Sequence, residues 1–459
     1  MIITKERISK ALKNVASFKV ATTEENSTPL VFKAEKIDGE KPYYKCFFRI
    51  FNTAESQQIV AGFVAMFQEG DAKEFSVALD RRRFVSVLDR LFAINERVMV
   101  KYNGTSITLS TEDGTMIPLE VQSEIPAPMN ILAKSDAVIT ARVGRTSFLD
   151  ALRVACVGAN EASSSEELKV VSLVFDTKRE KLSLCGLDGN SLAMGECTIA
   201  SNTFNKENAA EAEYAEAVAS RAKTYNEDCR SKFGLKEDEL PENKLIFTVS
   251  QSLLKTISTA ANPTASDKSK AFAVAVSPTQ IFCNIEGVCI SGVLSSAKSL
   301  FRYCEKTFDS TLLSRMTHVE LDTAGLESSL QLVETLSTDP VGKATVNFSL
   351  NDTALKLSSY GSTVSCNVIK LSGNPEAVHG KLDVGRLLSG SKGIGRGNLV
   401  LSFMEDDRFP VILRNGTIEE IGGCSVAVMP VNSAPAEKSS KNEDTSSESE
   451  ETSAESAAS

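Results

Sequence analysis

The sequence predicts an α+β protein built from three similar domains, each made of two copies of one strand–helix–strands unit. Three observations lead to this prediction. A short alternating strand followed by a polar, usually Gly-containing run recurs along the chain. An amphipathic helix precedes most of these strands. Two charged segments stand outside the repeats. Such a repeat places helices on one face and sheets on the other, with the domains strung in an arc.

The repeated strand is plainest in EKLSLCGLDG, where Leu182 and Leu184 alternate with Lys181 and Ser183 before a polar turn. Alternation of this kind is typical of a half-buried strand. The occurrences lie at residues 43–52, 105–114, 180–189, 279–288, 353–362 and 397–406.

Each predicted helix carries apolar residues at i, i+3 and i+4 spacing, so one face of each should be buried. The six ranges are 6–16, 81–93, 145–157, 250–261, 324–336 and 384–394. Pairing successive units predicts domains over residues 1–125, 136–310 and 316–431.

Two segments differ in composition from the repeats. Residues 201–243 are acidic and rich in helix formers, which predicts an exposed, charged helical insertion in the second domain. Residues 432–459 hold mainly Ser, Glu and Ala, so we expect a disordered acidic tail. These segments carry most of the net charge of −10. The remaining body is nearly neutral, and net charge does not exclude a DNA partner.

The residue usage argues against several kinds of chemistry. The ten cysteines never show CxxC spacing, and there are only two histidines, so neither a disulfide framework nor a metal site is expected. The charged start MIITKERISKAL does not resemble a signal peptide, and no apolar run approaches the roughly 20 residues of a membrane span. We therefore expect a cytoplasmic protein with reduced thiols and no cofactor.

The turn after Leu187 has several interpretations. Gly186, Asp188, Gly189 and Asn190 at a strand end fit a phosphate loop, a catalytic turn or a plain hairpin. A hydrolase using Asp188 with Ser191 or Asn190 is disfavoured because no histidine lies near this turn in the sequence. The Gly-rich run GSKGIGRG (390–397) lacks the residue order and strand–loop–helix setting of a P-loop.

Three stretches carry a family resemblance: CGLDGNSLA (185–193), DRFPVIL (407–413) and CSVAVMPV (424–431). Together with the sixfold repeat, they make residues 1 to about 431 similar to the bacterial beta-type DNA sliding clamp, the DNA polymerase III beta subunit family. The resemblance implies helices inside, sheets outside and a non-catalytic head-to-tail dimeric ring around duplex DNA that makes replication processive. The family's His-Arg pair is Asn190-Ser191 here, and its Pro is Ser299. These departures leave an alternative open beside the replicative clamp: a divergent clamp of a phage or mobile element with non-replicative partners.

The resemblance also implies a hydrophobic pocket between the second and third domains. This pocket would bind short linear peptides of the polymerase, the clamp loader and repair proteins. One wall is Val170, Leu187, Gly189, Asn190, Ser191 and Leu192, and the other is Arg408, Pro410, Val428, Met429, Pro430 and Val431; Ser299, Tyr303 and Cys304 complete it. The residue types fit, because apolar side chains, a flexible Met and a turn glycine are usual in peptide grooves.

Ring formation implies two further surfaces. Cations on the helices would face DNA phosphates without reading sequence: Lys10, Lys13, Arg82, Arg83, Arg90, Arg145, Arg153, Lys255, Arg386 and Lys392, with Lys5, Arg7, Arg81 and Arg396 nearby. The fifth helix, with Glu327 and Glu334, is an exception, and the alternative for each helix is a plain solvated face. Closure of the ring would pair Ile107 and Leu109 of one chain with Leu336 of the other.

Overall fold

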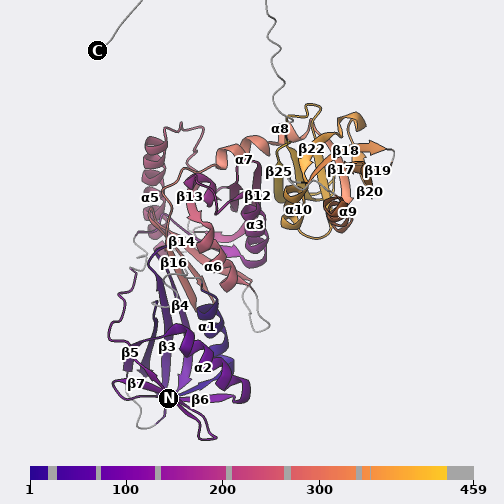
Figure 1. Cartoon of the computed structure of the whole chain (residues 1–459). Helices are drawn as coiled ribbons and strands as arrows, with labels where there is room; N and C mark the ends of the chain where they lie inside the picture. The colour runs from indigo at the N-terminus through magenta and orange to yellow at the C-terminus, as the bar shows by residue number, and fades with distance from the viewer. Residues whose placement is uncertain are drawn as a thin grey trace, which may run out of the picture.

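The computed structural model describes residues 1–18, 28–68, 74–129, 136–202, 209–262, 270–336, 344–351 and 353–431. We call residues 1–125, 136–310 and 316–431 domains 1, 2 and 3. Figure 1 shows them following one another along an arc, with the N-terminus in domain 1 at the lower end. The expected disordered tail, residues 432–459, lies outside the described residues. Within the described part of the chain, no helix has the length and apolar character that a membrane crossing requires.

Each domain contains the predicted unit, one strand, one helix and three strands, twice. Domain 1 consists of β1 (Ile2–Thr4), α1 (Lys5–Ser17), β2 (Leu30–Ile37), β3 (Tyr43–Asn52), β4 (Gln57–Met66), β5 (Glu74–Leu79), α2 (Arg81–Ile94), β6 (Arg97–Tyr102), β7 (Ser106–Ser110) and β8 (Met116–Glu120).

Domain 2 repeats this order and adds helices. It consists of β9 (Ile139–Gly144), α3 (Arg145–Gly158), α4 (Glu166–Lys169), β10 (Val170–Asp176), β11 (Lys181–Leu187), β12 (Ser191–Asn202), α5 (Ala209–Phe233), β13 (Lys244–Ser250), α6 (Gln251–Ala261), β14 (Ala271–Val276), β15 (Gln280–Ile285), β16 (Val288–Val293) and α7 (Phe301–Thr307).

Domain 3 follows after the short helix α8 (Ser310–Leu313). It consists of β17 (Thr317–Asp322), α9 (Thr323–Leu336), β18 (Thr345–Asn351), β19 (Ala354–Ser359), β20 (Ser362–Asn367), β21 (Lys370–Ser372), the 3-10 turn η2 (Pro375–Ala377), β22 (Gly380–Asp383), α10 (Val384–Ile394), β23 (Asn398–Phe403), β24 (Val411–Gly416) and β25 (Ile421–Val428).

The sheets run across both domain boundaries. Strand β4 of domain 1 pairs with β16 of domain 2, with Ile59 opposite Ile290. Strand β12 of domain 2 pairs with β25 of domain 3, with Leu192 opposite Ala427. Backbone hydrogen bonds therefore join neighbouring domains edge to edge.

Six helices form one continuous row. α2 contacts α1, α1 contacts α6, α6 contacts α3, α3 contacts α10, and α10 contacts α9. Figure 1 shows these helices along the concave side of the arc, with the sheets behind them. Each helix buries one apolar stripe, as Ile8, Leu12 and Val15 of α1 do, and so leaves its opposite face on the concave side.

Glycines allow α3 to lie unusually close to β11 and β12. A Cβ added at Gly186 would lie 2.2 Å from the Ala155 carbonyl oxygen, and one added at Gly195 would lie 2.4 Å from the Ala151 Cα. Real Cβ atoms do not approach backbone this closely, so only glycine fits at these two positions without a shift of the helix. The first glycine of the CGLDG stretch is thus a packing residue.

The insertion is helical as predicted, but the expectation that it is exposed holds for one face of the helix and not for the other. In α5, Ala215, Val218, Ala222 and Asn226 are buried, at a spacing that places them on one face. Tyr225 donates a hydrogen bond to the Ile246 carbonyl at 2.7 Å, which ties this face to β13. The insertion is therefore an integral layer of domain 2.

Candidate functional site

The GLDGN turn is a hairpin between β11 and β12. The Asp188 carboxylate accepts hydrogen bonds from the backbone N–H groups of Asn190 at 2.9 Å and Ser191 at 2.6 Å. Gly189 has a φ of +92°, a left-handed conformation in which glycine is unstrained. The second Asp188 oxygen accepts from the Arg386 guanidinium at 2.5 Å. Since the carboxylate is held by the turn and by domain 3, a phosphate loop or a catalytic aspartate is disfavoured here.

The structure brings the two predicted pocket walls together. Ser191 of β12 pairs with Val428 of β25, and the Met429 N–H donates to the Asn190 carbonyl at 2.8 Å. Arg386 of α10 strengthens the junction because it also reaches the Ser191 hydroxyl at 3.1 Å. Residues far apart in the sequence therefore share one surface at the boundary of domains 2 and 3.

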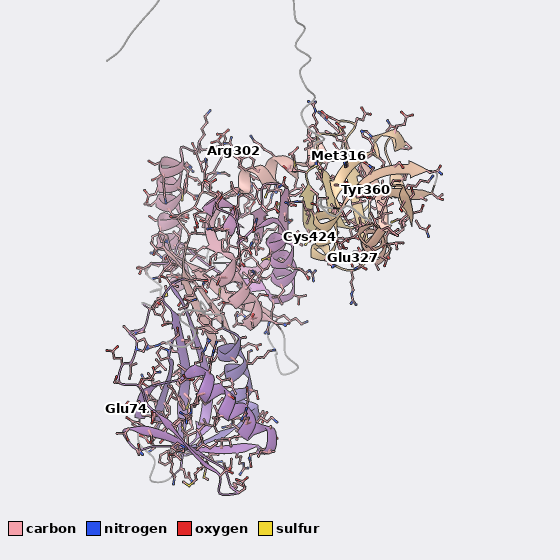
Figure 2. All side chains as sticks on the ribbon, in the orientation of Figure 1. Glu74, Arg302, Met316, Glu327, Tyr360 and Cys424 are labelled. Atoms are coloured by element: carbon pink, nitrogen blue, oxygen red, sulfur yellow. The ribbon has the colours of Figure 1, made fainter. Side chains whose placement is uncertain are left out.

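Beneath this surface lies a small apolar cluster drawn from both domains and from α7. Its buried members are Val174, Cys185, Leu192, Phe301, Cys304, Met316, Ile412 and Ala427, with Leu187 packed against it. In Figure 2, Met316 lies on the side of domain 3 that faces α7. Burial and the neighbouring Cys304 thiol raise the pKa of Cys185 well above its usual value. The Cys185 thiol is therefore a protonated packing group.

Several predicted wall residues are part of this floor or of the sheet itself and cannot touch a partner in this conformation. Val428 and Cys304 are 0% exposed, Ser191 is 3% exposed, and Val170 and Leu192 are each 7% exposed. Their predicted role as accessible walls is corrected accordingly. Ser191, Leu192 and Val428 lie in the β12–β25 ladder, and Leu192 and Cys304 belong to the cluster beneath the surface. Val170 pairs with Ser250 of β13.

The accessible part of the surface is a rim of apolar and polar side chains. Tyr303, Met429 and Val431 are exposed, as are Gly189, Asn190 and Arg408, while Leu187, Ser299, Pro410 and Pro430 are half-buried. Phe409, to which no role was predicted from the sequence, is also exposed. Since Val411 pairs with Val428, Phe409 and Pro410 continue alongside Met429 and Pro430. We call Leu187, Tyr303, Phe409, Met429 and Val431 the slot rim.

Arg408 is held in place at the edge of the slot rim. Its guanidinium donates to both Asp406 oxygens, at 2.9 and 2.7 Å. These hydrogen bonds lower the pKa of Asp406 to about 2. Arg408 is largely exposed and keeps donors directed to solvent, so it is a suitable polar anchor beside an apolar groove.

The prediction that Arg145 faces DNA is wrong. Arg145 is buried, and its guanidinium donates to the carbonyls of Ala261, Ala260 and Asn262 at the C-terminal end of α6. Arg81 repeats this arrangement in domain 1, where it is buried and donates to the Phe18 carbonyl at 2.8 Å, just after α1. Cations at a helix C-terminus satisfy free carbonyls and the helix dipole, so both arginines are structural.

Four other predicted DNA contacts are engaged within the chain. Lys10 pairs with Glu286 at 2.7 Å, Lys255 with Glu161 at 2.7 Å, and Arg386 with Asp188 at 2.5 Å. Arg153 pairs with Asp150 at 3.0 Å and donates to the Gly393 carbonyl at 3.0 Å. The contacts of Lys10, Arg153 and Arg386 join neighbouring domains. These three cations therefore help to fix how the domains are placed along the arc.

The remaining predicted cations are exposed on the helix row. Lys13, Arg82, Arg83, Arg90 and Lys392 are exposed, and Lys5, Arg7 and Arg396 are exposed beside them. In the residues that the structure describes, Lys13, Arg83, Arg90 and Lys392 form no ion pair. We call these four the open cations.

The prediction that Ile107 and Leu109 lie at the dimer interface is wrong. Both are 0% exposed, and β7 is paired on both sides, with β6 and β8. Within the described residues the outer strand is β8, which pairs along its length with β7 alone and carries the exposed Met116. Leu336 remains exposed, on α9 beneath β20. Among the strands that the structure describes, β20 is bonded to β19 alone, and Figure 1 shows it at the far end of domain 3.

Comparison with known proteins identifies the fold. Neither protein-family models nor curated sequences match the chain. Solved structures do: a DNA polymerase III beta subunit from Thermotoga maritima superposes with a TM-score of 0.68 at 15% identity, covering 94% of this chain and 99% of that one. The Helicobacter pylori beta clamp bound to a DNA ligase peptide superposes with a TM-score of 0.63 at 14% identity. The Bacillus subtilis sliding clamp superposes with a TM-score of 0.66 at 12% identity. Coverage of this chain is 94% for both, with 99% and 98% of those chains covered. The chain has the fold of bacterial beta-type sliding clamps.

Proposed function

We propose that two copies of this chain close head to tail into a ring that encircles duplex DNA and tethers a DNA polymerase and other partners. The observation that carries this proposal is the continuous row α2-α1-α6-α3-α10-α9 on the concave side of an arc. One chain supplies six helices and three domains, so two chains of this shape would complete a circle. The protein has no catalytic role in this account.

The chemistry of the concave side fits a sliding contact. The open cations belong to α1, α2 and α10, so exposed positive charge lies toward both ends of the row. Lysine and arginine contacts to phosphates give affinity without sequence information. A protein that must move along DNA needs contacts of this kind, because base-specific contacts would hold it at one site.

The two ends of the arc provide surfaces for closure. β8 at the end of domain 1 and β20 at the end of domain 3 each leave backbone N–H and C=O groups without a strand on one side, within the described residues. Exposed apolar side chains lie beside both edges: Met116 on β8, and Leu332 and Leu336 on α9. Pairing β8 of one chain with β20 of the other would satisfy the backbone groups and cover the apolar residues.

The slot rim fits partner peptides. Its exposed apolar side chains lie over a packed floor and beside Arg408 and Asn190, which is the usual composition of a peptide groove. A structure of similar fold from Helicobacter pylori is described as bound to a DNA ligase peptide. We infer that polymerase, clamp-loader and repair peptides bind this chain at the slot rim.

Sedimentation velocity tests the proposed ring. The wild-type chain should sediment at the mass of two chains. Met116→Lys should sediment as a folded monomer, because an unpaired charge in an apolar strand contact costs several kcal/mol. Ile421→Lys makes the same change at an exposed apolar site away from both edges and should leave the dimer intact. A monomeric wild type, or a dimer unaffected by Met116→Lys, contradicts the proposed closure.

A further inference from the structure

A cavity of ≈ 360 Å³ lies between the insertion helix α5, the loop that follows it and α7. This volume falls at the lower end of the range typical of ligand pockets. Apolar side chains from all of these parts line it, among them Tyr225, Phe233, Leu240, Ile246 and Phe301. None of the acids or cations discussed for DNA contact belongs to it, so its function is not explained by the ring.

The apolar floor of this cavity is fixed by the fold. The Tyr225 ring stacks on Phe247 at 4.9 Å, and its hydroxyl donates to Ile246 at 2.7 Å. Arg230 donates to the Leu240 carbonyl at 3.0 Å, which fastens the loop after α5 against the helix. A preformed hollow loses little entropy when it is filled, so it is suited to receive a rigid side chain.

The mouth of the cavity is positively charged. Lys232, Lys298, Arg302 and Lys306 line it, against Asp228 and Glu239. Arg302, labelled in Figure 2 on α7, pairs with Glu239. Lys298 and Lys306 are exposed, and across the described ranges neither takes part in an ion pair. The charge left over at the mouth is therefore positive.

The cavity is continuous with the slot rim through α7. Tyr303 belongs to the slot rim and also lines the cavity. Phe301 lines the cavity and packs into the floor of the slot. A peptide lying over α7 would therefore reach both sites.

We propose that this cavity binds an acidic linear peptide, with one bulky apolar side chain inserted between α5 and α7 and carboxylates against Lys298 and Lys306. The proposal rests on the proposed function, since the partner peptide would continue from the slot rim across α7. The apolar floor would contact the bulky apolar side chain of the peptide, and Lys298 and Lys306 would pair with the carboxylates on either side of it. The chain's own residues 432–459 are acidic but contain no large apolar side chain. Their charge is complementary to the basic mouth of the cavity, but they offer no side chain to fill its apolar floor.

Fluorescence anisotropy on the full chain tests this site. The probe is a fluorescein-labelled peptide of about twelve residues, one central Phe flanked by Asp and Glu, with a matched peptide carrying Ala for Phe. The double variant Lys298→Glu/Lys306→Glu should bind the Phe probe at least about tenfold more weakly, and the Ala probe should lose a similar factor on wild type. The control Lys223→Glu/Lys236→Glu makes the same charge change on exposed residues outside the cavity and should stay within about twofold.

Two further arms separate this site from the slot and from the tail. The Lys298→Glu/Lys306→Glu variant should weaken the Phe probe by a larger factor than it weakens a polymerase-tail peptide at the slot rim, because Lys298 and Lys306 line the cavity and do not belong to the slot rim. Absence of wild-type binding at about 1 mM probe, or equal loss in the control variant, overturns the proposal. So does a gain of more than about tenfold on deleting residues 432–459, which would make the tail the occupant. Dimer mass is measured without any peptide, so failure of the ring model would be seen separately.

Discussion

Replacing Gly186 by Ala should destabilise domain 2 by about 1–3 kcal/mol, although only one methyl group is added. The new Cβ would lie 2.2 Å from the Ala155 carbonyl oxygen and 3.0 Å from the Ala159 amide nitrogen. Both are backbone atoms, one in α3 and one in the residue that caps its C-terminal end, and they cannot rotate away as a side chain could. Helix and sheet would have to separate by about 1 Å to restore ordinary contact, and the displaced contacts lose dispersion energy.

Urea denaturation followed by circular dichroism measures this cost. Gly39→Ala is the matched control, because a Cβ there meets nothing within 4 Å. We expect a clearly lower midpoint for Gly186→Ala and a midpoint near wild type for Gly39→Ala. Equal midpoints for the two variants would show that α3 and β11 are not in close contact. Because Leu187 and Asp188 follow Gly186 directly, Gly186→Ala should also weaken peptide binding at the slot rim.

The remaining predictions concern DNA and partner peptides. Arg83→Glu/Arg90→Glu should weaken DNA association and reduce its salt dependence, because fewer phosphates are neutralised; unchanged affinity and slope in a salt titration would remove these residues from the interface. Met429→Ala and Phe409→Ala should each weaken a labelled polymerase-tail peptide by about 2 kcal/mol, roughly thirtyfold, at unchanged dimer mass. Asn190→Ala should cost about 1 kcal/mol or less. If wild type, Met429→Ala and Phe409→Ala bind the polymerase-tail peptide with equal affinity, the alternative of a divergent clamp with non-replicative partners is favoured.

The six helices and the repeated strands follow from the sequence because their periodicity is local. The predicted range 81–93 is α2 (Arg81–Ile94), and 384–394 is α10 (Val384–Ile394). Strand identity within a meander does not follow as easily. Both β7 and β8 alternate, and only pairing in three dimensions decides which of them is the outer strand. Pro118 in β8 was an available signal, since proline is tolerated on edge strands and not on central ones.

Long-range contacts account for the other differences. Arg145 was assigned to DNA because it lies on a basic helix, but its role depends on the end of α6, more than a hundred residues later. Two of the four buried residues of α5 are alanines and one is an asparagine, so the buried stripe gives a weak amphipathic signal beside many charged residues. The slot was located from the resemblance, whereas the burial of Val428 and Cys304 depends on strand pairing and on the placement of α7.

Retention on circular DNA tests the ring most directly. The protein is loaded with its clamp loader onto a nicked plasmid and passed through a gel-filtration column in about 0.5 M salt, where simple phosphate contacts are screened. A closed ring should stay with the circular plasmid and be lost when the plasmid is cut once, because it can then slide off an end. Loss from the circular plasmid at this salt, or equal retention on cut and uncut DNA, would contradict encirclement.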